Sequence, residues 1–157
     1  EELDRKMYDY LVKYLERKHY NHYEVSNFAL NGNESRHNLT YWNNEEYYGF
    51  GLSASGYLDG IRYTNTKNLT RYLQGKVNNE EEMLTMKDKM DNELMLGLRK
   101  TQGVCVAEFE EKYKLKLQDA YPIMPLLKQK DLCYKQGYLF IPKDKIYVMN
   151  EILLKML

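Results

Sequence analysis

Residues 23–63 read YEVSNFALNGNESRHNLTYWNNEEYYGFGLSASGYLDGIRY, and this stretch decides the fold. It begins with a short alternating segment at Tyr23–Phe28 and continues into a His-Asn-x-x-Tyr-Trp box at His37–Trp42. A turn rich in glycine and serine follows at Gly49–Gly56. The pair Asp59-Gly60 then lies between alternating apolar residues, which predicts a hairpin with a type I′ turn because both positions tolerate positive φ.

This combination resembles the oxygen-independent coproporphyrinogen III oxidase family of radical S-adenosylmethionine proteins. Within the family it resembles the haem-chaperone branch, whose mark is the box His37–Trp42. The resemblance runs from Tyr23 to the C-terminus. It implies a mixed α/β and α+β fold in which residues 1–78 form the C-terminal portion of a partial (β/α) barrel. Residues 79–157 would form a small winged-helix-like domain.

The cofactors that the resemblance implies belong to a longer parent protein. In this family a [4Fe-4S] cluster, held by three cysteines in a C-x-x-x-C-x-x-C run, binds S-adenosylmethionine. The sequence has two cysteines, Cys105 and Cys133, and therefore lacks this run. Because the chain begins with Glu1 and already shows helical spacing, we expect it to be a C-terminal fragment without enzyme activity of its own.

Charge and cysteine content narrow the functional classes. The 157 residues include 23 basic and 23 acidic side chains, so the net charge is zero and no basic patch for nucleic acid is predicted. Two widely spaced cysteines fit neither a disulfide scaffold nor a zinc site, which favours a reducing cytoplasmic location. The apolar runs are far shorter than the roughly 20 residues of a membrane-spanning helix.

Periodicity predicts a helix followed by a strand at the start of the chain. Apolar residues recur three and four apart over residues 3–18, which predicts an amphipathic helix whose aromatic and methionine stripe is core. The strand Tyr23–Phe28 would then belong to a parallel sheet. Glu24 and Ser26 share one face of this strand and would face a barrel lumen, or water if the strand is at an edge.

Capping residues and turns divide the next segment. Ser35 is predicted to cap a short helix that carries the box, and Asn44 to cap a further helical turn. A helix over residues 68–74 would end at Gly75. The polar composition of residues 77–82 predicts a linker between the two domains.

The second half reads as a winged-helix pattern. Helices are predicted at 85–99, 106–113 and 123–129, followed by a hairpin of residues 132–135 and 138–141 and a last helix at 145–157. The balanced charge argues against DNA binding, since phosphate contacts require clustered Lys and Arg. This domain is instead expected to brace the barrel or to meet a partner.

The box has a chemical interpretation as a haem site. Haem iron accepts a neutral imidazole as axial ligand, and flat apolar rings cover a porphyrin face. In a helix Tyr41 lies four residues after His37 and shares its face. We therefore assign His37 as the iron ligand, with Asn38, Tyr41 and Trp42 completing the site. The alternative is structural, with His37 hydrogen-bonded to its neighbours while Tyr41 and Trp42 pack into the core.

The glycine-rich turn is the second candidate site. Small residues let the backbone approach a ligand closely. In relatives the equivalent segment lines the adenosylmethionine and porphyrin cavity, which assigns Gly51, Ser53, Ala54 and Ser55, together with Glu24 and Ser26, to that cavity. Many relatives have histidine where this sequence has Ser55, so a catalytic role at this position is not expected. The alternative is that the glycines serve close packing alone. His19 and His22 are expected to be solvated.

The first functional hypothesis is a fragment of a haem chaperone that binds haem and delivers it to a recipient protein. The alternatives are a fragment of a true coproporphyrinogen III oxidase, which decarboxylates two propionates, and a winged-helix interaction module. An incomplete barrel would expose apolar edges, so association into homo-oligomers is also expected.

Overall fold

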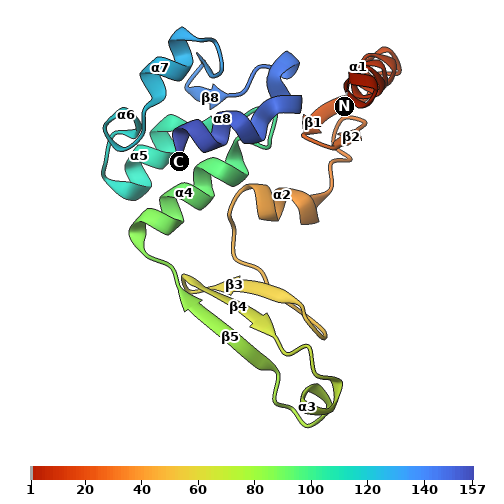
Figure 1. Ribbon diagram of the computed structural model, residues 1–157, viewed down its shortest axis with the longest axis vertical. Coiled ribbons are helices and arrows are strands. Elements are labelled where there is room, and N and C mark those ends of the chain that lie inside the picture. Colours follow the sequence, from red (N-terminus) through yellow and green to blue (C-terminus); the bar gives the residue numbers. More distant parts are fainter. Residues whose placement is uncertain (1) are drawn as a thin grey trace.

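The computed structural model describes residues 2–157 and has a mixed helix and sheet fold (Figure 1). Helix α1 (Glu2–Arg17) is followed by the strands β1 (Asn21–Glu24) and β2 (Asn27–Ala29) and by the short helix α2 (Arg36–Trp42). A three-stranded sheet then projects away from the helical C-terminal body, and α2 lies between the two (Figure 1). The predicted mixed fold class is confirmed.

The strand predicted at 23–28 is two strands. Val25 and Ser26 form a turn, and β1 pairs with β2 as an antiparallel hairpin, with His22 opposite Phe28. The expectation of a parallel αβ unit is therefore wrong for this segment. The other edge of β1 binds a distant part of the chain, since Val25 N donates to Arg99 O at 3.0 Å and Thr101 N to Tyr23 O at 3.1 Å.

The projecting sheet contains β3 (Ser55–Leu58), β4 (Ile61–Asn65) and β5 (Asn78–Met83), all antiparallel, and the helix α3 (Leu69–Leu73) lies at its far end. The predicted Asp-Gly hairpin is confirmed. Asp59 and Gly60 have φ values of 51° and 77°, and Leu58 pairs with Ile61. The helix predicted at 68–74 is confirmed as α3, and Asn68 is its N-cap.

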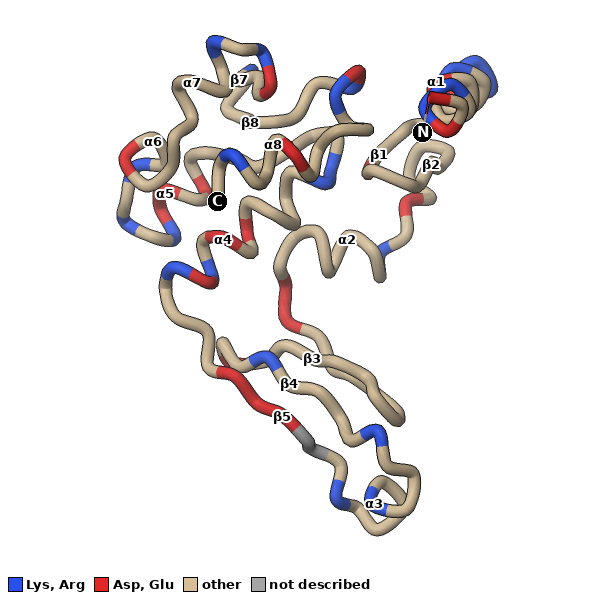
Figure 2. The backbone as a smooth tube through the Cα atoms, viewed as in Figure 1, with Lys and Arg blue, Asp and Glu red and all other residues tan. Residues whose placement is uncertain are grey.

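The linker predicted at 77–82 is wrong, because β5 pairs with β4 over this segment. The polar composition of residues 77–82 has another cause. Three consecutive glutamates, Glu80–Glu82, make β5 the acidic strand at one edge of the sheet (Figure 2). Charges on an edge strand discourage pairing with other chains, so polarity alone does not separate such a strand from a linker. The domain division near residue 78 stays a prediction.

The C-terminal body has the order of elements of a winged helix. Its first helix α4 (Met86–Gly97) begins with a capping box in which Thr85 and Asp88 exchange hydrogen bonds. The remaining elements are β6 (Val104–Cys105), α5 (Val106–Tyr113), α6 (Leu117–Ala120), α7 (Ile123–Lys128), β7 (Cys133–Lys135), β8 (Tyr138–Phe140), the 3₁₀ helix η1 (Lys143–Val148) and α8 (Met149–Met156). The predicted helices and wing are confirmed, except that the first part of the last helix, predicted at 145–157, belongs to the 3₁₀ helix η1. The elements β6 and α6 were not predicted.

One hydrophobic core holds this body together. The antiparallel sheet β6-β8-β7 and the helices enclose a core of almost fully buried side chains, among them Leu94, Phe109 and Ile152 from helices, Leu139 from β8 and Leu132 from the bend before β7. Burying one such side chain contributes about 1.5–3 kcal/mol. The body is therefore a well-packed support for the residues that contact the C-terminal end of α4.

The stripe of α1 is not core, contrary to the prediction. Leu3, Met7, Tyr10, Leu11 and Tyr14 are between 45% and 70% exposed, and none of the residues of α1 is buried. The periodicity gives the helix correctly but does not show what covers its apolar face. None of the helices in residues 2–157 is both long and apolar enough to cross a membrane.

Candidate functional site

The box lies on helix α2 and is fixed at its first turn. Ser35 is the N-cap, as predicted, and its Oγ accepts a hydrogen bond from Asn38 N at 3.3 Å. The backbone of Ser35 in turn donates to the hydroxyl of Tyr23 on β1, also at 3.3 Å. The beginning of α2 is thus joined to the hairpin that precedes it.

His37 and Tyr41 lie on one face of α2, as the four-residue spacing predicts. Their ring centroids are 4.7 Å apart with an interplanar angle of 83°. Tyr41 contacts Tyr47 in the same edge-to-face manner at 4.5 Å. The His37 side chain is exposed, and no hydrogen bond to its imidazole occurs within residues 2–157. The hydrogen bonds to neighbours that the structural alternative requires of His37 are therefore not found in the described residues, and the role of His37 in haem binding stays a prediction.

Trp42 points away from the His37 face. The two residues are five positions apart, which places them about 140° apart around a helix. The Trp42 ring lies instead under the guanidinium of Arg99 at 5.5 Å from the ring centroid. The next residue, Asn43, accepts a hydrogen bond from Lys100 Nζ at 2.6 Å. The box therefore has two faces. One carries His37 and Tyr41, and the other, with Trp42 and Asn43, contacts the C-terminal body.

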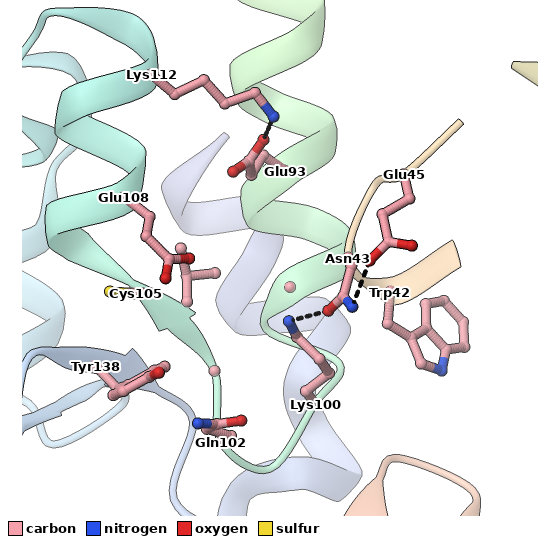
Figure 3. A pocket seen from close by; sticks show the side chains of 13 residues that line it. Trp42, Asn43, Glu45, Glu93, Lys100, Gln102, Cys105, Glu108, Lys112 and Tyr138 are labelled. Carbon is pink, nitrogen blue, oxygen red and sulfur yellow. Dashed lines mark hydrogen bonds and ion pairs between the residues drawn. The ribbon is translucent and has the colours of Figure 1, made fainter. Parts of the chain in front are cut away.

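A cavity of about 440 Å³ opens beside this second face (Figure 3). Trp42 and Asn43 line one side, and Cys105 and Glu108 line the other. Lys100 extends between them, and burial lowers the pKa of its amine. His37 is not among the lining residues, so the structure separates the predicted iron ligand from this cavity.

The glycine-rich turn is held by Asn65, a residue that the sequence does not mark. The amide of buried Asn65, at the end of β4, donates to the carbonyls of Gly49 at 3.0 Å and Gly51 at 2.9 Å. Ser53 has a left-handed φ of 61° and its backbone N donates to Thr66 O at 3.1 Å. No pattern in the sequence marks Asn65, because its partners are 14 and 16 residues away.

Side chains of the turn face outward. Ser53 and Ser55 are exposed, Gly51 and Ala54 are half-buried, and the Ser55 hydroxyl lies 3.3 Å from the Thr64 hydroxyl. None of the predicted cavity residues lines the cavity beside Trp42. Their assignment to an adenosylmethionine and porphyrin cavity stays a prediction.

Glu24 and Ser26 do not form the predicted pair on one strand face. Glu24 on β1 is 1% exposed, and its Oε1 has no hydrogen-bond partner within residues 2–157, whereas Ser26 lies exposed in the turn. The solvated state expected for His22 is also wrong. Its ring is buried, stacks on Phe28 at 4.3 Å and has a pKa lowered by burial.

Comparison with known proteins shows which proteins the chain is similar to. Residues 84–140 match the family model described as the HemN C-terminal domain. The haem chaperone HemW of Lactococcus lactis is 47% identical over 135 residues, which cover 83% of this chain and 36% of that protein. The haem chaperone HemW of Bacillus subtilis is 35% identical over 156 residues, which cover 96% of this chain and 40% of that protein. Over most of its own length the chain is therefore similar to proteins named haem chaperones, and residues 84–140 are similar to the HemN C-terminal domain.

One solved structure has a similar fold. Coproporphyrinogen III oxidase (HemN) of Escherichia coli, a radical SAM enzyme, superposes with a TM-score of 0.70 over 94% of this chain and 39% of the enzyme, at 16% sequence identity. At this identity the likeness concerns the fold alone. The chain spans well under half the length of the HemW proteins that it matches.

Proposed function

We propose that this chain binds haem through His37 and that, as part of a haem chaperone, it delivers haem to a recipient protein. The observation that carries the proposal is the exposed His37 imidazole, which meets Tyr41 edge-on at 4.7 Å and is engaged in no hydrogen bond within residues 2–157. Imidazole nitrogen is a common axial ligand of haem iron. The relatives named haem chaperones support the same function.

The surroundings of His37 suit a porphyrin. Tyr41 and Tyr47 continue the row of rings, and the segment that follows exposes two stacked rings, Tyr48 and Phe50, which are 66% and 85% exposed. Aromatic surface of this kind offers flat apolar contact to a macrocycle. Because the ligand lies on the surface, bound haem would remain within reach of an acceptor protein, as delivery requires.

The residues of this chain do not fit an iron-sulfur cluster. A radical S-adenosylmethionine cluster requires three cysteine ligands, and the sequence contains two cysteines, both half-buried and free. Under our proposal S-adenosylmethionine and the [4Fe-4S] cluster belong to other residues of the complete protein. The two free thiols are compatible with a reducing compartment, and we propose a cytoplasmic location.

Titration with haemin tests the proposal. The wild-type chain should shift the Soret band of haemin on binding, and His37→Ala should weaken binding at least about tenfold, since it removes the iron ligand. His19→Ala is the matched control, because His19 is another exposed histidine outside the box. Indistinguishable titrations of wild type and His37→Ala would refute the proposal. Transfer to an apo haem protein, followed by the acceptor's own Soret band, would then test delivery.

A further inference from the structure

The segment Arg99–Thr101, just after α4, holds both the hairpin and the box. It pairs with β1 through the backbone hydrogen bonds of Val25 and Thr101, and the Thr101 hydroxyl also donates to His22 O at 2.7 Å. Its side chains reach α2, where Arg99 covers Trp42 and Lys100 bonds Asn43. One short segment of the C-terminal body therefore fixes the end of α2 opposite to its Ser35 cap.

Lys100 is bonded differently from the other lysine of the cavity. Lys112 forms an ion pair with Glu93. Lys100 has no ion pair within residues 2–157, and its partner is the neutral amide oxygen of Asn43. A half-buried ammonium group requires hydrogen-bond acceptors, because burial penalises its charge. The 2.6 Å bond is thus a charge-assisted contact that fixes where Asn43 lies.

Asn43 can satisfy Lys100 in one orientation only. Its Oδ1 accepts from Lys100 while its Nδ2 donates to Glu45 Oε1 at 2.9 Å. Asn43 is also the C-cap of α2, with its backbone N donating to Leu39 O at 2.8 Å. Fixing the Asn43 side chain therefore fixes the last turn of the helix that carries His37 and Tyr41.

Trp42 depends on the same support. Its Nε1 is buried without a hydrogen-bond partner in the described part of the chain, so the indole is placed by ring contacts rather than by its N–H group. The contact that the structure shows is the guanidinium of Arg99, 5.5 Å from the ring centroid.

We propose that Lys100 is a positioning residue of the haem site, which holds the C-terminal turn of α2 against the winged-helix body so that the His37 face keeps its orientation. This inference rests on the proposed binding of haem at His37. Under this inference the C-terminal body sets the geometry of the box through two contacts, Lys100 with Asn43 and Arg99 with Trp42.

The sole tryptophan of the chain, Trp42, gives a readout that does not require haem. In Lys100→Ala we expect the fluorescence emission of Trp42 to move to longer wavelength and its quenching by acrylamide to increase. Lys100→Arg should stay close to wild type, because a guanidinium can also donate to Asn43. Lys112→Ala is the matched control, since it removes a lysine of the same cavity whose ion-pair partner is Glu93 on α4 and not a residue of α2.

Haemin titration of the same variants completes the test. Lys100→Ala should weaken haemin binding about tenfold, because a hydrogen bond to a charged group is lost. The Soret maximum of its complex should equal that of wild type, since His37 remains the ligand. Asn43→Ala should weaken binding similarly, and the double variant Asn43→Ala/Lys100→Ala no further, because the two residues act through one bond.

The outcomes separate this inference from the proposed function. If the Trp42 fluorescence of Lys100→Ala equalled that of the wild-type chain, the positioning role would be overturned directly. If Lys100→Ala bound haemin as tightly as wild type while His37→Ala bound it more weakly, the inference would be overturned and the proposed function would stand. Wild-type affinity in His37→Ala would refute the proposed function, and the role of Lys100 toward haem would fall with it. A loss in Lys112→Ala equal to that in Lys100→Ala would show a general effect of the cavity and also overturn the inference.

Discussion

The imidazole of His37 lies edge-on to the ring of Tyr41, with centroids 4.7 Å apart and planes at 83°. This contact limits the orientations open to a side chain that is otherwise exposed. Edge-to-face pairs are worth about 0.5–1.5 kcal/mol beyond buried area. Tyr41→Phe should therefore leave haemin affinity nearly unchanged, while Tyr41→Ala should lower it roughly fivefold. Equal affinities of Tyr41→Ala and wild type in a Soret titration would show that the ring plays no part in binding.

Two glycines with similar backbones should differ sharply in their tolerance of alanine. Gly103 and Gly137 have φ values of +80° and +86°, but a Cβ at Gly103 would lie 2.0 Å from Leu139 O, while Gly137 has open space. Gly137→Ala should cost about 1–2 kcal/mol of unfolding free energy from backbone strain alone. Gly103→Ala should cost about 3–5 kcal/mol, because β6 must also move away from β8. Urea denaturation of both variants measures the difference, and equal costs would contradict the close approach.

Buried His22 should make the protein sensitive to mild acid. Burial lowers its pKa below 6.5, so the unfolded chain takes up a proton at higher pH than the folded chain does. The stabilising contribution is present above about pH 6.5 and is lost as the pH falls toward the lower folded pKa. The free energy of unfolding should fall by up to about 1.4 kcal/mol per pH unit in that window.

Replacing the histidine tests this pH dependence. His22→Gln should flatten the profile of unfolding free energy below pH 6.5, and His19→Gln, which alters an exposed histidine, should leave it as in wild type. An unchanged slope in His22→Gln would assign the acid sensitivity to another group.

The apolar stripe of α1 should promote association of the isolated chain. Met7 and Leu11 are 62% and 45% exposed on a helix without buried residues. Exposed apolar patches of this kind favour contacts between chains. We expect dimers or larger species in size-exclusion chromatography with light scattering, and a return to monomer in Met7→Glu/Leu11→Glu. Leu154→Glu, at a residue that is 83% exposed on α8, is the control. A wild-type chain that stays monomeric at high concentration would contradict this expectation.

The sequence by itself determined the features that depend on neighbouring residues. Asp59-Gly60 specifies a hairpin turn because both residues accept positive φ, and Ser35 caps α2 because its hydroxyl reaches a backbone N–H three residues on. The four-residue spacing placed His37 and Tyr41 on one face for the same local reason. The resemblance to the family was also visible in the sequence, since the box and the following turn are close together in the chain.

Tertiary structure alone decided where these local pieces pack. Asn43 and Lys100 are 57 residues apart, and nothing in either neighbourhood signals their bond. In the sequence the acidic strand β5 resembles a linker, and only the structure shows that it pairs with β4. The apolar stripe of α1 resembles core, although its side chains are exposed. Local chemistry determines turns, caps and helix faces. Burial and strand pairing depend on which residues from distant parts of the chain pack against an element. A periodic pattern within the element carries no information about those residues.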